Sequence, residues 1–392
     1  MSRLRPSWLA VYAVALGTFT LVTNEFLPVG LLTAIGADLH VSEGVAGTTM
    51  TVPGVVAAVA APTLTVAAGR LDRRIALLAM TALFTVSDLL AAAASGFAMM
   101  LLARFLLGLG IGGFWAIGAG VGGRLAGQRA AVTATSVIFA GVSVASVIGV
   151  PAGAFIGGHF GWRTAFVAAA VLGVLALVLQ LALLPRMGVD QPVTWRSLAT
   201  VLRGPNARVG LATTLLLVIG QFTAYTYVQP FLERHTGASP TTVSTLLLVY
   251  GIAGIAGSLA AGAALERRLY AAIVTIIATL GLAALAMTVL GTTTAGAIIV
   301  LAIWGLVYGT VPVAMQTWIF TADRSTPEGG SALYISAFQI SVAGGSLLGG
   351  RIVDGTGGSV AAMLTGGLLA LTALALFVSL ARRPAADLQP VI

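Results

Sequence analysis

Long apolar stretches, separated by short polar segments, dominate the pattern along this chain of 392 residues. The hydrocarbon core of a bilayer is about 30 Å thick, so a spanning helix needs roughly 20 consecutive apolar residues. Twelve stretches have this length, and they fall into two sets of six. The predicted spans are 8–34, 43–68, 75–94, 97–122, 130–158, 163–184, 208–232, 240–264, 270–290, 293–321, 328–350 and 358–381. The pattern therefore predicts an all-α integral membrane protein with twelve transmembrane helices.

The longest polar connection divides the chain into two six-helix halves. We predict an N-terminal half over 1–184, a cytoplasmic linker over 185–207 and a C-terminal half over 208–392. The linker contains prolines, and its residues 194–202 carry apolar side chains near helical spacing. This spacing favours a short helix that lies on the membrane surface.

Two short sequences recur in the halves at nearly the same offset. The sequence LDRR at 71–74 is matched by LERR at 265–268, which lies 194 residues later. A glycine pair at 157–158 is matched by another at 349–350, which lies 192 residues later. Repeated halves related by an axis along the membrane normal are a transporter architecture, with the substrate site near the midplane between them.

Composition supports a membrane protein and excludes several other classes. Hydrophobic residues make up 58% of the chain and charged residues only 8%, whereas soluble domains carry about 25% charged residues. There is no lysine, which excludes a P-loop nucleotide site, and no cysteine, which excludes disulfides and cysteine metal ligands. The histidines at 40, 159 and 235 are too scattered for a metal site. We therefore predict no metal, no cofactor and no catalytic residues.

The arginines predict which ends of the helices face the cytoplasm. With the N-terminus inside, sixteen arginines lie on the cytoplasmic side and only Arg163, Arg234 and Arg351 lie outside. This bias follows the positive-inside rule, so both termini are expected in the cytoplasm. It also accounts for the net charge of +8 without any binding of nucleic acid. The first apolar stretch has no A-x-A cleavage site and is expected to remain as the first helix.

Three charged residues lie inside the apolar spans: Glu25, Asp88 and Arg104. A charge within a membrane is costly, which makes each a functional candidate. At a rise of about 1.5 Å per residue, all three lie roughly 10–14 Å below the outer surface. One arginine neutralises one carboxylate at a time, so an acid whose partner changes between conformations can take up and release a proton. We favour Glu25 as this acid over a permanently paired Glu25, and expect Asp88 to be either a second coupling acid or a structural partner of Arg104.

Four motifs resemble those of a known family. They are 23–32 (TNEFLPVGLL), 69–74 (GRLDRR), 104–112 (RFLLGLGIG) and 149–153 (GVPAG), the last followed by 161–163 (GWR). On these residues the chain resembles the major facilitator superfamily, and within it the twelve-helix bacterial drug:proton antiporter branch. The subgroup that it resembles contains sugar efflux, nucleoside efflux and chloramphenicol-resistance permeases. The resemblance covers about residues 8–382.

The resemblance implies roles for two further sets of residues. One set would form an inner gate that stabilises the outward-open state. The alternative is that the aspartate of this set caps a helix and its arginines only set the topology. The predicted gate residues are Gly69, Asp72, Arg73 and Arg74. The other set would bend helix five into a hinge or leak barrier, with close packing as the alternative. The predicted hinge residues are Gly149, Pro151 and Gly153.

Polar and aromatic residues within the spans outline a cavity between the halves. Apolar walls with a few placed polar groups suit a small, partly apolar ligand, although any single aromatic residue is also explained by packing. The candidate cavity residues are Asn24, Trp115, Phe139, Gln221, Tyr225, Gln229, Trp304, Tyr308, Gln316, Trp318 and Gln339.

These features together predict a secondary active transporter in the cytoplasmic membrane of a bacterium. We expect it to export a small organic solute of drug, sugar or nucleoside type by proton antiport and alternating access, with the proton gradient as its energy source. Its expected partners are the substrate, protons and the lipid bilayer, and it is expected to be a monomer. Uptake or facilitated diffusion is one alternative, which the helix-five motif disfavours. An intramembrane enzyme or a non-transporting membrane sensor is another, but the sequence contains no suitable catalytic pair and no added soluble domain.

Overall fold

The computed structural model describes residues 8–67, 71–118, 121–127, 130–188, 204–322, 327–356 and 358–381. Within these ranges the chain is helical and forms no strand, and twelve helical segments are long and apolar enough to cross a membrane, as predicted. The spans are Trp8–Gly30, Glu43–Leu64, Arg73–Ala92, Phe97–Trp115, Thr133–Phe160, Trp162–Leu183, Pro205–His235, Pro240–Ala260, Arg268–Leu290, Thr294–Ile319, Leu333–Gly355 and Ser359–Leu380. The predicted surface helix at 194–202 lies outside the described residues.

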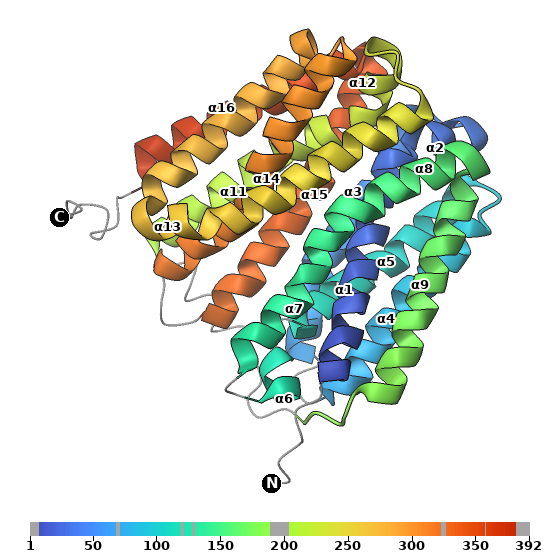
Figure 1. Ribbon diagram of the computed structural model, residues 1–392, viewed down its shortest axis with the longest axis vertical. Coiled ribbons are helices and arrows are strands. Elements are labelled where there is room, and N and C mark those ends of the chain that lie inside the picture. The colour runs from blue at the N-terminus through green and yellow to red at the C-terminus, as the bar shows by residue number, and fades with distance from the viewer. Residues whose placement is uncertain are drawn as a thin grey trace.

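The helices form two groups that lie side by side in Figure 1. The first bundle contains α1 (Trp8–Phe26), η1 (Leu27–Gly30), α2 (Leu32–Asp38), α3 (Glu43–Ala67), α4 (Arg73–Ala92), α5 (Phe97–Gly118), α6 (Gly122–Ala126), α7 (Ala131–Val144), η4 (Ala145–Gly149), α8 (Val150–Phe160) and α9 (Trp162–Leu183). The second bundle contains α11 (Pro205–Tyr225), α12 (Val228–His235), α13 (Pro240–Leu290), α14 (Thr294–Ala322), α15 (Pro327–Thr356) and α16 (Ser359–Leu380). The bundles meet where α15 packs on α3 and where α13 packs on α8 and η4.

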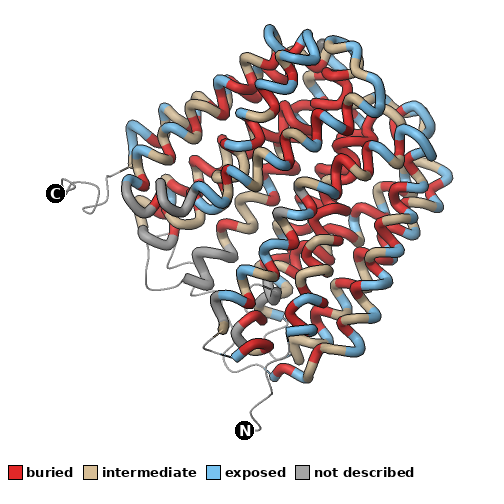
Figure 2. The backbone as a smooth tube through the Cα atoms, in the orientation of Figure 1, coloured by how far each residue is buried: buried red, intermediate tan, exposed pale blue. Residues whose placement is uncertain are grey.

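Burial follows this arrangement. Buried positions gather where helices face one another, and exposed positions lie on the outer sides of both bundles (Figure 2). Many exposed residues are large and apolar, such as Leu259 at 80% exposure and Val289 at 72%. Apolar surface of this extent is a liability in water but is favourable against lipid tails.

The first span of each bundle is broken near its far end. In the first bundle, α1 ends at Phe26 and a short 3₁₀ turn containing Pro28 precedes α2. Proline has no N–H to donate to the preceding turn, so the helix cannot continue through it. In the second bundle, Thr226 and Tyr227 separate α11 from α12. The break leaves the last carbonyls of α1 without partners inside the helix.

The glycines of the helix-five motif pack against helix one. A Cβ added to Gly153 would lie 2.2 Å from Cδ1 of Leu27, so only glycine allows this approach with the side chain in place. The same close approach pairs Gly149 with Thr23 and Gly157 with Leu31. A π-helical turn, η4, directly precedes Pro151 in the same span, and π-turns and prolines are common sites of helix bending. The hinge role of this segment stays a prediction.

The connection between the eighth and ninth spans differs from the predicted loop. Element α13 consists of two helices that meet at a kink without a longer loop, and Arg268 at the kink departs from helical geometry, with φ −150° and ψ 70°. A single non-helical residue is therefore sufficient to turn the chain into the next span.

Helices α13 and α14 approach closely through glycines, and this contact allows a test. A Cβ on Gly309 would lie 2.0 Å from the backbone oxygen of Gly254, so Gly309→Ala must push the helices apart. Overpacking of this kind costs about 1–3 kcal/mol. We expect Gly309→Ala to lower the melting temperature of the purified protein in detergent.

The matched control is Gly254→Ala at the same contact. Its added Cβ would lie 3.4 Å from the oxygen of Gly305, an ordinary contact distance. We expect its melting temperature to equal that of the wild type. An equal loss in both variants would contradict the packing explanation.

Candidate functional site

Glu25 lies in the last turn of α1, next to the helix break, and is 4% exposed. Its Oε1 accepts a hydrogen bond of 3.0 Å from Nε2 of Gln339 on α15, so its side chain joins the two bundles. The Oε1 atom of Gln339 is buried and has no hydrogen-bond partner. The acid favoured for proton coupling and one predicted cavity residue are thus in direct contact.

Arg104 is fully buried in α5 and binds backbone rather than carboxylates. Its guanidinium donates to the carbonyl oxygens of Thr49 at 2.8 Å, Asn24 at 2.8 Å and Glu25 at 3.0 Å. Two of these carbonyls belong to the last turn of α1, where helix carbonyls lack intrahelical partners and a cation is favoured by the helix dipole. Arg104 therefore caps the end of α1 and ties it to α3.

Asp88 is fully buried in α4 and lies against Asn24. Nδ2 of Asn24 donates to Oδ2 of Asp88 at 2.5 Å. Among the described residues no ion pair joins Arg104 to Asp88 or to Glu25. Asp88 therefore makes no hydrogen bond to Arg104, whose Nε, Nη1 and Nη2 atoms each donate to a carbonyl, but the two groups still interact electrostatically. The role of Asp88 as a structural partner of Arg104 stays a prediction. Asn24, predicted as a cavity residue, is instead the partner of Asp88.

Several predicted cavity residues gather in an aromatic cluster of the second bundle. Nε1 of Trp304 donates to Oε1 of Gln221 at 2.7 Å, and Nε2 of Gln221 donates to the hydroxyl of Tyr250 at 3.0 Å. The ring of Tyr225 stacks on that of Tyr250 with centroids 4.7 Å apart. These hydrogen bonds fix the ring orientations deep inside the bundle.

The cluster extends to the residue that follows Glu25. Phe222 stacks on Phe26 of the first bundle at 5.6 Å and meets the rings of Tyr308 at 6.3 Å and Phe338 at 6.4 Å edge-on. Phe338 in turn lies 6.0 Å from the ring of Tyr334, whose hydroxyl is buried without a partner. Phe26, Tyr308 and Phe338 are only partly buried. Aromatic faces and an available hydroxyl thus lie close to Glu25.

The sequence reasoning missed five residues of this site: Phe26, Phe222, Tyr250, Tyr334 and Phe338. Each is an aromatic residue within a predicted span, so the criterion that selected Tyr225 and Tyr308 would have found them. The position of Thr49 as an acceptor for Arg104 had no comparable signal, because any residue has a carbonyl.

Other predicted cavity residues lie elsewhere. Trp115 and Phe139 form a separate ring pair in the first bundle, 5.6 Å apart. Gln316 is half-buried further along α14. Trp318 packs on the ring of Phe377 at 4.8 Å inside the second bundle. The structure therefore does not gather these residues around Glu25.

The predicted inner-gate residues contact their own bundle. Oδ1 of Asp72 accepts from the backbone N–H of Arg74 at 2.8 Å and of Met187 at 3.0 Å, and so caps α4. The N–H of Arg73 donates to the carbonyl of Met187 at 2.9 Å. These contacts match the capping alternative, and the gating role stays a prediction. Gly69 lies outside the described residues.

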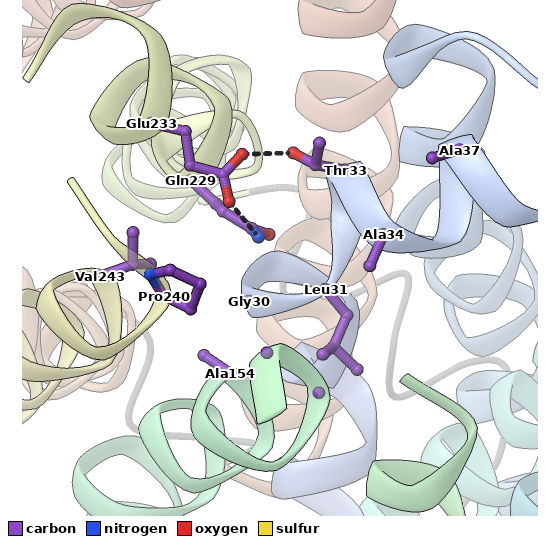
Figure 3. A pocket seen from close by; sticks show the side chains of 12 residues that line it. Gly30, Leu31, Thr33, Ala34, Ala37, Ala154, Gln229, Glu233, Pro240 and Val243 are labelled. Carbon is purple, nitrogen blue, oxygen red and sulfur yellow. Dashed lines mark hydrogen bonds between the residues drawn. The ribbon is translucent and has the colours of Figure 1, made fainter. Parts of the chain in front are cut away.

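A polar contact at the other end of the molecule joins the bundles beside a cavity. Gln229, a predicted cavity residue, lies here on α12, and its Oε1 accepts from the N–H of Leu32 at 2.9 Å. Glu233 accepts from the hydroxyl of Thr33 at 2.9 Å and from Nε2 of Gln229 at 2.8 Å. Figure 3 shows Glu233 between these two side chains at the edge of a cavity of about 260 Å³, which also borders Pro240.

Further contacts at this end link the bundles. Asp354 at the end of α15 accepts from the hydroxyl of Ser42 at 2.6 Å and from the N–H of Gly44 at 3.0 Å. Arg234 forms an ion pair with Glu43. Asp354 and Arg234 lie at the ends of the eleventh and seventh spans, and Ser42, Glu43 and Gly44 lie at the start of the second span. The contact is therefore on the face opposite the start of α1 and the end of α16.

The GWR sequence of helix six anchors the first bundle at this same end. Arg163 donates to Asp38 at 2.6 Å and to the carbonyl of Ala94 at 2.8 Å, and Trp162 donates to Asp38 at 3.3 Å. The hydrogen bond from Arg163 is the main cause that lowers the pKa of Asp38 below its ordinary value. This group therefore connects the end of helix one to helices three and six.

Comparison with solved structures places the fold. The human organic anion transporter MFSD10 (TETRAN) superimposes with a TM-score of 0.72 and 16% identity, and covers 95% of this chain and 100% of its own. The D-xylose-proton symporter superimposes with a TM-score of 0.76 and 13% identity, over 97% and 99% of the two chains. Likeness at these identities concerns the fold alone.

Comparison of sequences gives evidence about the family as well as the fold. The sequence is 36% identical to the purine ribonucleoside efflux pump NepI of Salmonella typhimurium (strain LT2) over 370 residues, which covers 94% of this chain and 93% of the relative. The same values hold for NepI of Salmonella paratyphi B. The profile of the Major Facilitator Superfamily matches residues 14–333. The chain therefore belongs to the Major Facilitator Superfamily and is a multi-pass membrane transporter rather than an enzyme.

Proposed function

We propose that this transporter exports a small solute of the purine ribonucleoside type from a bacterial cytoplasm in exchange for protons. The relatives at 36% identity carry that substrate in their name, over 94% of this chain. The aromatic cluster near Glu25 is chemically suited to such a solute. A planar base stacks on aromatic rings, and ribose hydroxyls require polar partners such as the buried hydroxyl of Tyr334 and the free oxygen of Gln339.

The hydrogen bond between Gln339 and Glu25 is the observation that carries the proton-coupling proposal. Arg104 is held by three carbonyls and cannot follow the Glu25 carboxylate during a rearrangement of the bundles. When the bundles separate at this level, Glu25 loses the donor of Gln339. An ionised carboxylate without a hydrogen-bond donor is costly inside a membrane. Glu25 therefore binds a proton at this stage. Separation of the bundles and protonation of Glu25 are thereby linked.

The direction of access follows from the contacts between the bundles. With both termini in the cytoplasm of the bacterium, as the arginine distribution predicts, the contacts of Asp354, Arg234 and Gln229 close the outer face. The described arrangement then corresponds to a transporter that is closed to the outside. Opening of this contact exposes the site to external protons, and its closure follows release of the solute.

Glu25→Gln tests the coupling. Glutamine keeps the size and polarity of the side chain but has no acidic proton to release or take up. In proteoliposomes loaded with a pH gradient, we expect the variant to lose gradient-driven accumulation of a radiolabelled purine ribonucleoside. Exchange of labelled for unlabelled nucleoside without a gradient should remain, because the binding groups are intact.

The control is Asp38→Asn, an acid at the outer end of the same bundle that is remote from the site. This variant should accumulate nucleoside as the wild type does. Gradient-driven accumulation by Glu25→Gln at the wild-type rate would refute the role of Glu25. A wild type that only equilibrates nucleoside would indicate facilitated diffusion.

Asp354→Ala tests the contact that closes the outer face. The substitution removes two hydrogen bonds between the bundles at an exposed position. A loss of about 1 kcal/mol raises the ratio of open to closed forms about fivefold. The chain has no cysteine, so a single Ala34→Cys in the cavity wall reports opening through its rate of labelling by a membrane-impermeant maleimide.

We expect faster labelling in Asp354→Ala than in the parent Ala34→Cys protein. The control is Arg351→Ala, which changes an exposed residue one turn earlier on the same helix. Unchanged labelling in Asp354→Ala, or an equal increase in Arg351→Ala, would show that Asp354 does not hold the bundles together.

A further inference from the structure

The pair formed by Asp88 and Asn24 has two oxygen atoms that lack a donor. Both side chains are fully buried, and a single hydrogen bond joins Nδ2 of Asn24 to Oδ2 of Asp88. The second oxygen of the carboxyl group, Oδ1 of Asp88, and the amide oxygen, Oδ1 of Asn24, have no hydrogen-bond partner. An ionised carboxylate in this position would be buried with one donor for its two oxygens, an arrangement that is strongly unfavourable.

Among the described residues, no charged group donates a hydrogen bond to the Asp88 carboxyl group. Helix α4 packs against α1, α5 and α9. On α5, the guanidinium of Arg104 donates its hydrogen bonds to backbone carbonyls and interacts with Asp88 only at longer range. On α1, the carboxyl group of Glu25 is bound to Gln339 of α15. The arginine of α9, Arg163, lies beyond the end of α4, where it is bound to Asp38 and to the carbonyl of Ala94. The nearest complementary group to Asp88 is therefore the neutral amide of Asn24.

One proton on Asp88 satisfies both unpartnered atoms at once. A carboxylic acid has one O–H donor and a carbonyl acceptor, and a primary amide offers the reverse pair. In a planar acid–amide ring the acid carbonyl accepts from Nδ2 of Asn24, which is the observed bond, and the acid hydroxyl donates to Oδ1 of Asn24. We propose that Asp88 is permanently protonated, forms this acid–amide ring with Asn24, and acts as a positioning residue that exchanges no protons.

The ring has a consequence for the transport site. Asn24 is held by its side chain to α4, and its backbone carbonyl holds Arg104. The next residue, Glu25, is thereby fixed at the end of α1 with its carboxyl group toward α15. Glu25 is then the single exchangeable acid among the embedded charges, which predicts one proton per cycle. This consequence rests on the proposed antiport, whereas the ring itself does not.

Infrared spectroscopy tests the protonation state directly. We compare Glu25→Gln with Glu25→Gln/Asp88→Asn in D₂O, so that the difference spectrum contains the Asp88 carboxyl group and, with opposite sign, the amide that replaces it. We expect the C=O stretch of a protonated carboxyl group at every pH from about 5 to about 9, the range in which ordinary carboxyl groups are ionised. A carboxylate band in that range would overturn the proposal. The spectrum needs no substrate, so a failure of the proposed antiport leaves this result valid.

Transport by conservative and disruptive variants gives a second readout. Asp88→Asn keeps both hydrogen bonds, because its amide donates to Oδ1 of Asn24 and accepts from Nδ2. We expect it to retain the rate and pH profile of wild-type transport, as should the exchanged pair Asn24→Asp/Asp88→Asn. Asp88→Leu leaves the amide of Asn24 without partners and should lose at least about tenfold in rate. Abolished transport or a shifted pH profile in Asp88→Asn would show that Asp88 does exchange protons.

Discussion

The binding of the Arg104 guanidinium to the end of α1 is the interaction on which the rest of the site depends. Pro28 ends helix one within the membrane and leaves carbonyls that no helical N–H can reach. In lipid such carbonyls must find a donor inside the protein. Arg104 supplies it for Asn24 and Glu25 and also binds Thr49 of α3. Among the described residues, this buried cation is thus hydrogen-bonded to a helix terminus and forms no direct ion pair with a carboxylate.

This arrangement separates the environments of the two embedded acids. Because Arg104 is occupied, neither acid has an ion-pair partner among the described residues. Asp88 lies inside the first bundle, where its carboxyl group is hydrogen-bonded to the amide of Asn24. Glu25 faces the second bundle, and its partner Gln339 moves when the bundles move. Two carboxyl groups at similar depth therefore have different chemistry because one lies inside a bundle and the other between bundles.

The sequence predicts the twelve spans and the three embedded charges well, because both depend on apolar length and on the cost of charge in lipid. It does not predict the partners. Arg104 binds carbonyls, which every residue possesses, so no side-chain pattern marks its acceptors. Gly153 of the helix-five motif contacts Leu27 of the helix-one motif. These two motifs therefore form one packed surface, which the sequence does not show because it does not say which helices are neighbours. Gln229 lies beyond the break of helix seven at Thr226 and Tyr227, where Pro230 in the first turn of α12 offers no N–H to the carbonyl of Thr226.

The paired breaks in helices one and seven link the site to the contact between α2 and α12. Beyond each break the chain continues as a short helix, α2 or α12, and these two helices carry Thr33 and Glu233, which join the bundles. Glu25 lies just before the first break and Tyr225 just before the second. A broken helix can change direction at its break without the loss of further backbone hydrogen bonds. The segments beyond the breaks can therefore part while α1 stays fixed to Arg104, so the same residues that hold the site in place also leave the contact between α2 and α12 free to open.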